Sequence, residues 1–533
     1  MVRSLLLAPR LLPPRLLSTP PLEGEFQIPL PNSPVGGRLA LFLDQWGEIT
    51  TDSWVLSIIR GGLDLQFKRR PPLSVTPIPF SVPSDPQKVL LLDTEVSTLL
   101  QKAAIELVPP SALDPGFYSR IFLVPKKTGG MRPVIDLSVL NTFLVVPHFK
   151  METNRSIRAS ILPGMWTTSF DLADAYFHCP IAPSFRKYLR FVWNDQVFQF
   201  RALPFGLAIA PLVFTKIFQA ALAHLHSLSI QIHSYLDDSL LKEFNPDILR
   251  SHTRTVILLF LKLGFLISWK KSDLIPSQDF VFLGERYRTD LGLIFPLEEK
   301  FQSLCQFIQF ILKKQTLTAR QFSQLLGLLN SLADVVPLGR LHIRPLQFYL
   351  FEHWTPASQE WEALIPILSS LDHHLRWWTI RENVMSGHLL LPPPPSLTLY
   401  SDASNLGWGA YLNGQTVSGL WSPLLRKEHI NFLEMKAAFL ALSHFKETLS
   451  NQSVVLATDN STVVAYLENQ GGTHSFSLFQ LAREILLFCF RLQIRLVVRH
   501  IPGRLNLLAD CLSRSLAPVN TENGNFFSLC STQ

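Results

Sequence analysis

Apolar residues recur along the middle of the chain in short runs separated by turn-forming residues, a pattern typical of strands. The stretch "IFLVPKKTGGMRPVIDL" predicts a hairpin that turns at Gly129-Gly130 and carries Lys127 and Arg132 near its tip. The stretches "WTTSFDLADAYFHCPI" and "RKYLRFVWNDQVFQFRALPFG" are strand-like, and residues 211–225 predict a helix. Strands that alternate with helices in this way indicate an α+β domain.

The stretch "SYLDDSLL" places two carboxylates, Asp237 and Asp238, between the end of one predicted strand and the start of the next. Adjacent carboxylates repel each other, so a buried Lys or Arg or a divalent metal is needed to neutralise them. Asp171 follows the apolar run "WTTSF" and supplies the third carboxylate of a site for two Mg²⁺ ions and phosphoryl transfer. Because successive strand residues point to opposite faces, we assign the main bridging role to Asp237. The alternative is that Asp171 caps a turn and the aspartate pair is a solvated hairpin tip.

A second set of acids lies near the carboxyl end of the chain. The stretch "SLTLYSDASNLGWGAYLNGQTVSGLWSP" predicts three short strands with Asp402 on the first, and "NFLEMKAAFLALSHF" predicts a helix with Glu434 in its first turn. A buried strand then ends at Asp459, and a last strand leads to His500 and, ten residues later, Asp510. Four acids from separate elements predict a second two-metal site, here for hydrolysis of a phosphodiester by water. The alternative is four unrelated surface acids.

Residues 297–332, between the two sets of acids, are strongly helical in pattern. Helices that lie along a nucleic-acid duplex have this character, and Lys313, Lys314 and Arg320 would then contact phosphates. A plain helical bundle fits the pattern equally well.

The composition indicates a folded chain of several domains, because 533 residues exceed the size of one hydrophobic core and 47% of them are hydrophobic. The formal charge of +7 suits a polyanionic partner. The five cysteines are far apart and lack metal-binding spacing, which favours a reducing compartment. No apolar run is long enough to cross a bilayer, so no membrane partner is expected. The compartment stays unknown: the cytoplasm or nucleus is expected, and a mitochondrial address is disfavoured because prolines interrupt the basic leader.

Proline-rich stretches mark the expected domain boundaries. The predicted organisation is a proline-rich leader (1–35), an amino-terminal extension (36–86), an α+β domain (87–288), a helical region (289–350), a connection and linker (351–396), a second folded domain (397–515) and a tail (516–533).

The motifs "VPKKTGGMRPVIDLSVLN", "FDLADAYF", "LPFGLAIAP" and "YLDD" occur in the order found in reverse transcriptases, and residues 89–284 resemble that family. The resemblance implies a right-hand polymerase, with the fingers and palm at residues 87–288 and a thumb-like region at residues 289–350. It implies palm metal ligands at Asp171, Asp237 and Asp238, a triphosphate grip at Lys127 and Arg132, a steric gate at Tyr176, a nucleotide-pocket floor at Phe205 and Gly206, a primer grip at the "FLGE" turn, and a weaker candidate proton donor at Lys271.

Residues 397–514 resemble ribonuclease H, which implies an α/β domain after the polymerase. Its metal-binding acids match Asp402, Glu434, Asp459 and Asp510, and its mobile histidine matches His500. The loop "RHIPGRLN" departs from the glycine-rich loop of the retroviral enzymes, which weakens the match at His500.

This domain order resembles retroviral, gypsy-type, hepadnaviral and DIRS-type polymerases, and "SDASNLGWGAYL", "RLHIRPLQ" and "HIPGRLNLLADCLSR" look most like the DIRS type. The resemblance implies a retrotransposon enzyme that copies RNA into DNA and degrades the RNA of the hybrid, with two Mg²⁺ per site, Mn²⁺ being a possible substitute. Its partners would be an RNA template, a DNA primer, the RNA/DNA hybrid and dNTPs, with a recombinase or integrase on a separate chain. The alternative is an inactive relic or a domesticated nucleic-acid-binding protein.

Overall fold

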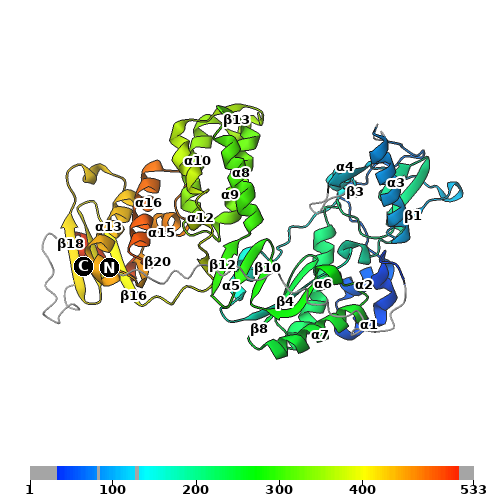
Figure 1. Ribbon diagram of the computed structural model, residues 1–533, viewed down its shortest axis with the longest axis horizontal. Helices are drawn as coiled ribbons and strands as arrows, with labels where there is room; N and C mark the ends of the chain where they lie inside the picture. Colours follow the sequence, from blue (N-terminus) through cyan, green and yellow to red (C-terminus); the bar gives the residue numbers. More distant parts are fainter. Residues whose placement is uncertain (1–32, 81–84, 126–130, 515–533) are drawn as a thin grey trace. The chain divides into compact units, whose positions relative to one another are not determined.

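The computed structural model describes residues 33–80, 85–125 and 131–514 (Figure 1). The chain divides into two compact units, Met1–Leu283 and Gly284–Gln533, and each is described by itself.

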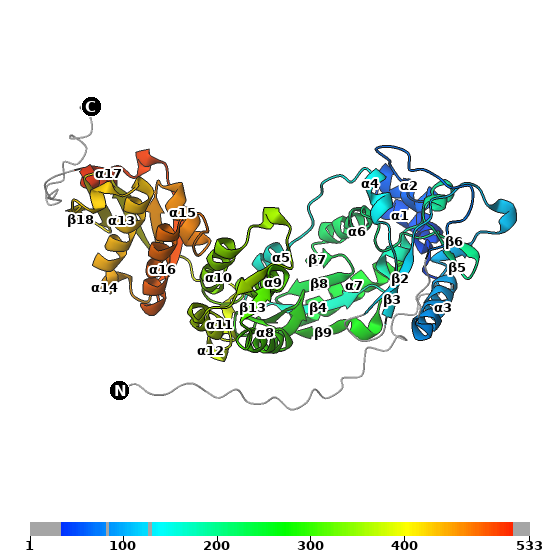
Figure 2. The same cartoon turned by 90° about the horizontal axis from the view of Figure 1, so that it is seen from above.

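The central sheet of the first unit has the strand order β7-β8-β4-β9, and all of its paired strands are antiparallel (Figure 2). Strands β7 (Ile232–Tyr235) and β8 (Asp238–Glu243) are joined by a two-residue turn, and β4 (Trp166–Asp171) pairs with β8. Helix α7 packs on this sheet, and it begins where Asn245 accepts hydrogen bonds from two backbone amides ahead of it. The sheet thus brings the three predicted palm acids to one end of β4 and β8.

Two smaller sheets lie in the same unit. Strands β2 and β3 form the predicted antiparallel hairpin, although its turn lies outside the described residues, and β1, β6 and β5 form a second antiparallel sheet. The remaining elements of this unit are α1 (Leu43–Ile49), α2 (Ser53–Gly61), α3 (Pro86–Gln101), β1 (Ile105–Leu107), β2 (Ile121–Pro125), β3 (Met131–Ile135), α4 (Ser138–Phe143), α5 (Asn154–Ser160), β5 (Arg190–Trp193), β6 (Gln196–Phe200), α6 (Ala210–Ser227), α7 (Pro246–Lys262), β9 (Asp273–Ser277) and β10 (Asp279–Phe282).

Helices α1 and α2 belong to the core of the first unit. The indole of Trp46 is fully buried, and its Nε1 donates a hydrogen bond of 3.0 Å to the carbonyl of Leu263. The Arg38 guanidinium, also buried, donates through Nε to the carbonyl of Gly264.

The strand reading of "LADAYFHCPI" is wrong. Strand β4 ends at Asp171, and Ala175–His178 form a short 3-10 helix, η4. Asp174 precedes it with a φ of 53°, a left-handed conformation that Asp tolerates better than most residues, and an ion pair of 2.8 Å with Lys102 fixes its side chain. The turn buries three successive side chains, Tyr176, Phe177 and His178, whereas an extended strand would point Phe177 to the face opposite its two neighbours.

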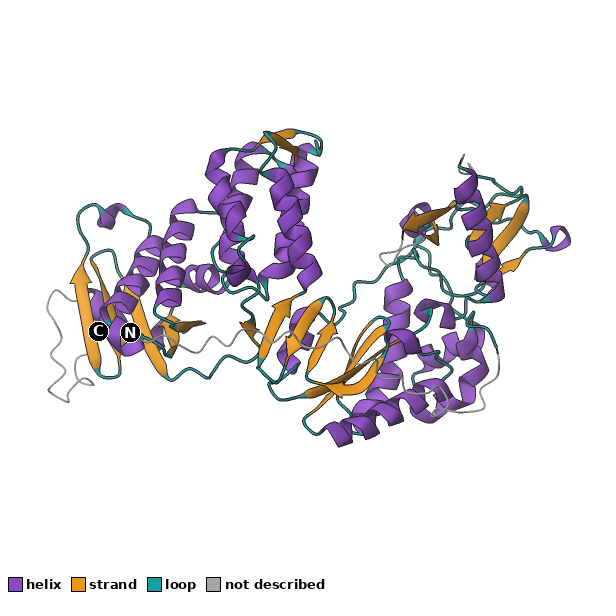
Figure 3. Ribbon diagram, viewed as in Figure 1, coloured by secondary structure: helices purple, strands orange, loops and turns teal. Residues whose placement is uncertain are grey.

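The second unit contains a helical region that begins with α8 (Glu298–Ile311), α9 (Ala319–Ala333) and α10 (Gly339–His353), purple in Figure 3. The helical pattern of residues 297–332 is interrupted, because Lys313 and Lys314 leave α8 and β13 (Thr316–Thr318) intervenes before α9. Thr318 and Gln321 form a reciprocal capping box that begins α9. The other elements of this region are β11 (Glu285–Arg288), β12 (Leu293–Pro296), β14 (Leu364–Pro366), α11 (Asp372–Trp377), α12 (Arg381–Val384) and β15 (His388–Leu389).

A five-stranded mixed sheet follows, with the strand order β18-β17-β16-β19-β20. The first three strands form the predicted antiparallel meander, and β19 and β20 continue it in parallel, with α15 and α16 in the crossover. Helices α13 and α17 pack on β16 and β17. The bounds are β16 (Leu397–Ala403), β17 (Gly407–Leu412), β18 (Gln415–Leu420), α13 (Ile430–His444), α14 (Lys446–Leu449), β19 (Ser453–Thr458), α15 (Ser461–Glu468), α16 (Phe476–Arg491), β20 (Arg495–His500) and α17 (Leu507–Arg514).

Within the described ranges, no helix has the length and apolar character needed to cross a membrane. No disulfide joins any two of the four cysteines that the structure describes, Cys179, Cys305, Cys489 and Cys511.

Candidate active sites

The first candidate site lies at the turn between β7 and β8. Asp171 and Asp238 are directly opposite each other in the β4–β8 register, so their side chains share one face of the sheet. Asp237 lies in the turn, directly after Leu236, which has a left-handed φ of 57°. The backbone carbonyl of Asp237 accepts a hydrogen bond of 3.1 Å from the amide of Leu172. The two ends of the acid-bearing strands are therefore tied together through the backbone.

Burial and the neighbouring charges raise the pKa of two carboxyls at this site, those of Asp171 and Asp238. Burial, and after it the charges of Asp237 and Asp171, raise the pKa of Asp238 to about 6. Burial also raises the pKa of Asp171. The Lys271 ammonium, whose Nζ lies 3.2 Å from Asp171 Oδ2, lowers this pKa but does not offset the effect of burial. The charge of Asp237 acts on both of the other carboxyls and raises the pKa of each.

Lys271 occupies the position of a counter-cation at this site. Its side chain is 67% exposed whereas that of Asp171 is 12% exposed, so the ammonium reaches in from solvent and can leave without breaking the core. The ligand atoms of the three palm acids are not gathered as tightly as those of the second site described below.

Tyr176 lies close to both the acids and the predicted pocket floor. Its ring is buried, with its centroid 4.9 Å from that of Phe205 and 5.6 Å from that of Phe214. Burial, followed by the charge of Asp237, raises the pKa of the Tyr176 hydroxyl to about 12. Phe205 is 43% exposed, so Tyr176 and Phe205 together form an aromatic wall that is open on one side.

Asn141 fixes the loop that carries Phe205 and Gly206. Its Nδ2 donates to the carbonyl of Gly206 at 2.9 Å, and its Oδ1 accepts from the amide of Ala208 at 2.9 Å. Gly206 has a φ of 95°, and a Cβ at this position would lie 3.0 Å from the carbonyl oxygen of Ile135, so a larger residue would be strained. Asn141 ends the motif "VIDLSVLN", but its spacing alone gave no role for it.

The other predicted contacts of this region are only partly described. Lys127 lies outside the described residues, and Arg132 lies on β3, where only its backbone is described. The "FLGE" motif forms a tight turn in which Leu283 and Gly284 both have positive φ. Of the predicted thumb cations, Arg320 is paired with Glu362 at 2.7 Å, whereas Lys313 and Lys314 are exposed just after α8.

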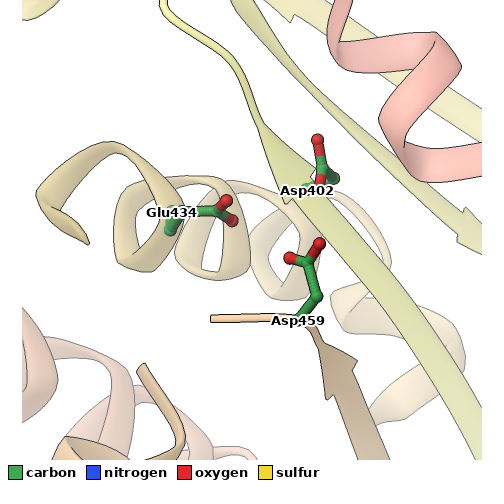
Figure 4. A group of neighbouring side chains, drawn as sticks. All are labelled: Asp402, Glu434 and Asp459. Atoms are coloured by element: carbon green, nitrogen blue, oxygen red, sulfur yellow. The ribbon is translucent and has the colours of Figure 1, made fainter. Parts of the chain in front are cut away.

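The second candidate site gathers Asp402, Glu434 and Asp459 (Figure 4). Each offers a carboxylate oxygen, and these oxygens all lie within 4.8 Å of one another. They come from β16, α13 and the end of β19, and this is the only such group of three in the part of the chain that the structure describes. Glu434 is the fifth residue of α13 and so lies beyond the first turn, contrary to the sequence prediction.

The electrostatics of this cluster fit a divalent cation. Burial, and then the charges of Asp402 and Asp459, raise the pKa of Glu434 to about 9, and burial raises that of Asp402 to about 6. The Oε2 of Glu434 is buried and has no hydrogen-bond partner in the described part of the chain. A set of hard oxygen donors that repel one another, with one oxygen unsatisfied, is what Mg²⁺ or Mn²⁺ would stabilise.

Two buried side chains hold the Asp402 carboxylate. The Ser513 hydroxyl donates to Oδ2 at 2.7 Å, and Asn506 Nδ2 donates to Oδ1 at 3.3 Å. Both Ser513 and Asn506 are 1% exposed. The sequence analysis missed both residues.

Helix α17 reaches Asp402 because β17 presents a glycine to it. Gly409 pairs with Asp402 in the β16–β17 register, so both face the helix. A Cβ on Gly409 would come within 2.4 Å of Leu512 Cβ and 2.6 Å of the Ala509 carbonyl oxygen. A side chain here would push α17, and Ser513 with it, away from the site.

Asp510 and His500 lie beside the cluster without joining its tight group. Asp510 forms a 2.6 Å ion pair with Arg514 one helical turn later. The His500 ring is exposed, and its Nε2 lies 3.0 Å from the Asp459 carbonyl; because a carbonyl only accepts, this nitrogen carries the proton. The four predicted acids thus comprise a tight group of three and a fourth that is engaged by an arginine.

Comparison with known proteins identifies the class of the first unit. Residues 124–287 match the family model described as "Reverse transcriptase (RNA-dependent DNA polymerase)". The chain is 25% identical over 469 residues to the genome polyprotein of Petunia vein clearing virus (isolate Hohn), covering 85% of this chain and 20% of the relative. It is 23% identical over 411 residues to the transposon Tf2-3 polyprotein of Schizosaccharomyces pombe, covering 74% of this chain and 28% of the relative.

Solved structures share the fold. The structure of the foamy viral protease-reverse transcriptase dRH in complex with ds DNA matches 90% of this chain and 84% of its own with a TM-score of 0.53 and 16% identity. The structure of the foamy viral protease-reverse transcriptase in complex with RNA/DNA hybrid matches 91% of this chain and 62% of its own with a TM-score of 0.51 and 16% identity. The chain therefore contains a reverse transcriptase domain of the kind found in retroviral and retrotransposon polyproteins, on a polymerase fold. It spans less than a third of the length of those polyproteins.

Proposed function

We propose that the chain is an RNA- and DNA-directed DNA polymerase that also cleaves the RNA strand of the RNA/DNA hybrid it makes. The observation that carries the polymerase assignment is the arrangement of Asp171, Asp237 and Asp238 at one sheet end inside the segment that matches the reverse transcriptase family. The cluster of Asp402, Glu434 and Asp459 supports the second activity on a ribonuclease H-like domain.

In the first site, Asp237 and Asp238 with Asp171 would hold two Mg²⁺ ions. Bound there, the metal ions would supply Lewis acidity to the 3′-hydroxyl and to the leaving pyrophosphate. Asp237 is the best placed to serve both ions, because its charge acts on both neighbouring carboxyls. Lys271, released from Asp171, would be free to carry a proton or a phosphate charge.

Around these acids, the aromatic wall selects the nucleotide. The buried Tyr176 ring would lie under the sugar and leave no room for a 2′-hydroxyl, while Phe205 and Gly206 form the floor. The hydrogen bonds from Asn141 hold that floor in place. Lys127 and Arg132 would grip the triphosphate as paired cationic donors.

In the second site, Asp402, Glu434 and Asp459, with Asp510 once it leaves Arg514, would hold the metal ions for hydrolysis. Ser513 and Asn506 orient the Asp402 carboxylate. His500 lies at the exposed edge with a protonated Nε2, a position from which it can move a proton to or from solvent.

The element of origin is proposed to be DIRS-type. The motifs "SDASNLGWGAYL" and "HIPGRLNLLADCLSR" carry Asp402, Gly409 and Ser513, which the structure brings together around one carboxylate. In this assignment the recombinase or integrase is encoded on another chain.

The test is primed extension of a homopolymeric RNA template with dNTPs and Mg²⁺, followed by gel analysis of the template strand. The expected result is DNA synthesis together with shortening of the RNA. A protein that binds the primed template but neither extends it nor cleaves it would instead be an inactive nucleic-acid-binding relic.

A further inference from the structure

A polar cavity of about 290 Å³ lies between α9 and α10 in the second unit, apart from both acid clusters. Its polar lining comes from Asn330, Asp334, Arg340, Arg344 and Gln347. The cavity thus contains two guanidinium groups and one carboxylate, and its lining carries one net positive charge.

Arg344 is the unusual member of this set. Its Nη1 donates to Gln347 Oε1 and its Nη2 to the carbonyl of Asn469, each at 2.9 Å, but both acceptors are neutral. Its Nε is buried and has no hydrogen-bond partner among the described residues. No carboxylate forms an ion pair with Arg344 among the residues that the structure describes, so a half-buried cation is left without a counter-charge.

Arg340 is the second guanidinium of the cavity. Asp334 accepts two hydrogen bonds from its guanidinium, at 2.7 and 3.1 Å, and so neutralises it. Arg340 nevertheless acts on Arg344: burial lowers the pKa of Arg344, and the charge of Arg340 lowers it further. Such a pair of guanidinium groups would be stabilised by an anion with several acceptor oxygens, of which a phosphate is the common biological form.

Helix α15 connects this cavity to the second acid cluster. Asn469, which accepts from Arg344, follows the last residue of α15, whereas Asp459 lies just before the residue that caps its start. Eight helical residues span about 12 Å. That separation corresponds to roughly four base-pair steps of a duplex.

We propose that the Arg340–Arg344 cavity binds one backbone phosphate of the nucleic-acid duplex whose RNA strand lies at Asp402, Glu434 and Asp459. Because the cavity lies at a fixed distance from these acids, a phosphate bound in it would determine which position of the RNA strand lies at the acids. The proposal rests on the proposed function, because it takes the hybrid as the ligand. The competing role is purely structural, with Arg344 fastening α10 to the end of α15.

The experiment measures binding of a fluorescent 18-base-pair RNA/DNA hybrid to the full chain by anisotropy, in EDTA so that no cleavage occurs, at several salt concentrations. The expected result is that Arg340→Gln weakens binding about 3- to 10-fold and lowers the slope of log Kd against log salt by about 0.9, the value for one lost phosphate contact. Asp334→Asn should act in the opposite direction and tighten binding, because it removes the only acid of the cavity lining while leaving both arginines.

The sign of the Asp334→Asn effect separates the two roles. If the Arg340–Asp334 ion pair has only a structural role, either substitution destabilises the protein. Both variants would then melt at a lower temperature than the parent but bind the hybrid as tightly as the parent does. That result would overturn the proposal. Arg376→Gln is the matched control, since Arg376 is an exposed arginine that pairs with Asp372 on α11. An equal loss of affinity in this control would show a general charge effect and also overturn the site. If the parent protein does not bind the hybrid, the proposed function itself is wrong, because the hybrid is then not its partner. If the parent binds the hybrid and the variants bind it with the same affinity, only the proposed phosphate site is wrong.

Discussion

The Ser513 hydroxyl donates a 2.7 Å hydrogen bond to the Asp402 carboxylate, across 111 residues of sequence. One helix, α17, thus carries both a candidate metal ligand, Asp510, and the group that orients another ligand on β16. The assembly of the second site therefore depends on how closely α17 lies against the sheet.

Ser513→Ala should weaken Mg²⁺ binding at the second site. Loss of a hydrogen bond to a metal-binding carboxylate typically lowers metal affinity 10- to 100-fold, so the Mg²⁺ midpoints of hybrid cleavage and of thermal stabilisation should both rise by about tenfold or more. Ser404→Ala is the control, because Ser404 donates to the Ser513 carbonyl at 2.7 Å without touching Asp402. Equal shifts in the two variants would mean that Ser513 acts only by docking the helix.

The stability of the metal-free protein should fall as pH rises. Asp402 and Glu434 have folded-state pKa values raised from 3.8 to about 6 and from 4.5 to about 9, so the folded state holds their protons more tightly than the unfolded state does. Their contribution to stability is complete below about pH 4 and is lost as pH rises through these folded values.

Mg²⁺ requires the ionised carboxylates, so the rise in melting temperature on adding Mg²⁺ should increase between pH 6 and pH 9. Calorimetry with and without Mg²⁺ across this range checks the trend. Glu434→Gln removes the group with the higher pKa and should flatten the curve above pH 7; an unchanged curve would remove Glu434 from the cluster.

Tyr176→Val should relax the choice between dNTPs and rNTPs. The ring is buried against Phe205, and its loss opens the space that a 2′-hydroxyl would need. Steady-state incorporation of each nucleotide opposite the same template base measures the effect, with an expected gain in relative rNTP use of at least tenfold. If discrimination is unchanged while dNTP incorporation persists, Tyr176 is a core residue and not the gate.

The two sites should fail independently. Asp237→Asn should abolish polymerisation and spare hybrid cleavage, and Asp459→Asn should do the reverse, since each removes one charge from a separate acid set. Neither should lower the melting temperature of the metal-free protein, because each relieves repulsion between carboxylates. Both activities and both melting curves are measured on one preparation, and loss of both activities from either change would contradict two separate centres.

The elements predicted correctly from the sequence are those whose apolar periodicity and turn residues lie within one continuous stretch of the chain. The β16–β18 meander, helix α6 and the β2–β3 hairpin all follow their expected runs, since each has a clear period and its own turn residues. The segment from Ala175 to His178 was misassigned because its aromatic residues satisfy a strand pattern, while the bend depends on a left-handed Asp174 and on distant Lys102.

The acids of the candidate sites could be named from motifs, but their supporting residues could not. Ser513 and Asn506 each contact Asp402 from more than a hundred residues away, and a hydroxyl or amide that does so leaves no spacing signal. Asn141 lies inside a recognised motif, yet only its bonds to Gly206 and Ala208 reveal its part. The lone cation at Arg344 likewise depends on which neighbours the fold brings to it.

The buried contacts of Arg38 and Trp46 determine where a polymerase fragment can begin. Both side chains reach the chain reversal at Leu263 and Gly264, directly after α7, the helix that packs on the acid-bearing sheet. A fragment that started at residue 87, the boundary suggested by the proline-rich stretch, would leave two backbone carbonyls unpaired and open the packed face where the indole of Trp46 meets Phe265. For production of a soluble catalytic fragment, the amino-terminal cut therefore belongs before residue 33 and not at the proline-rich stretch.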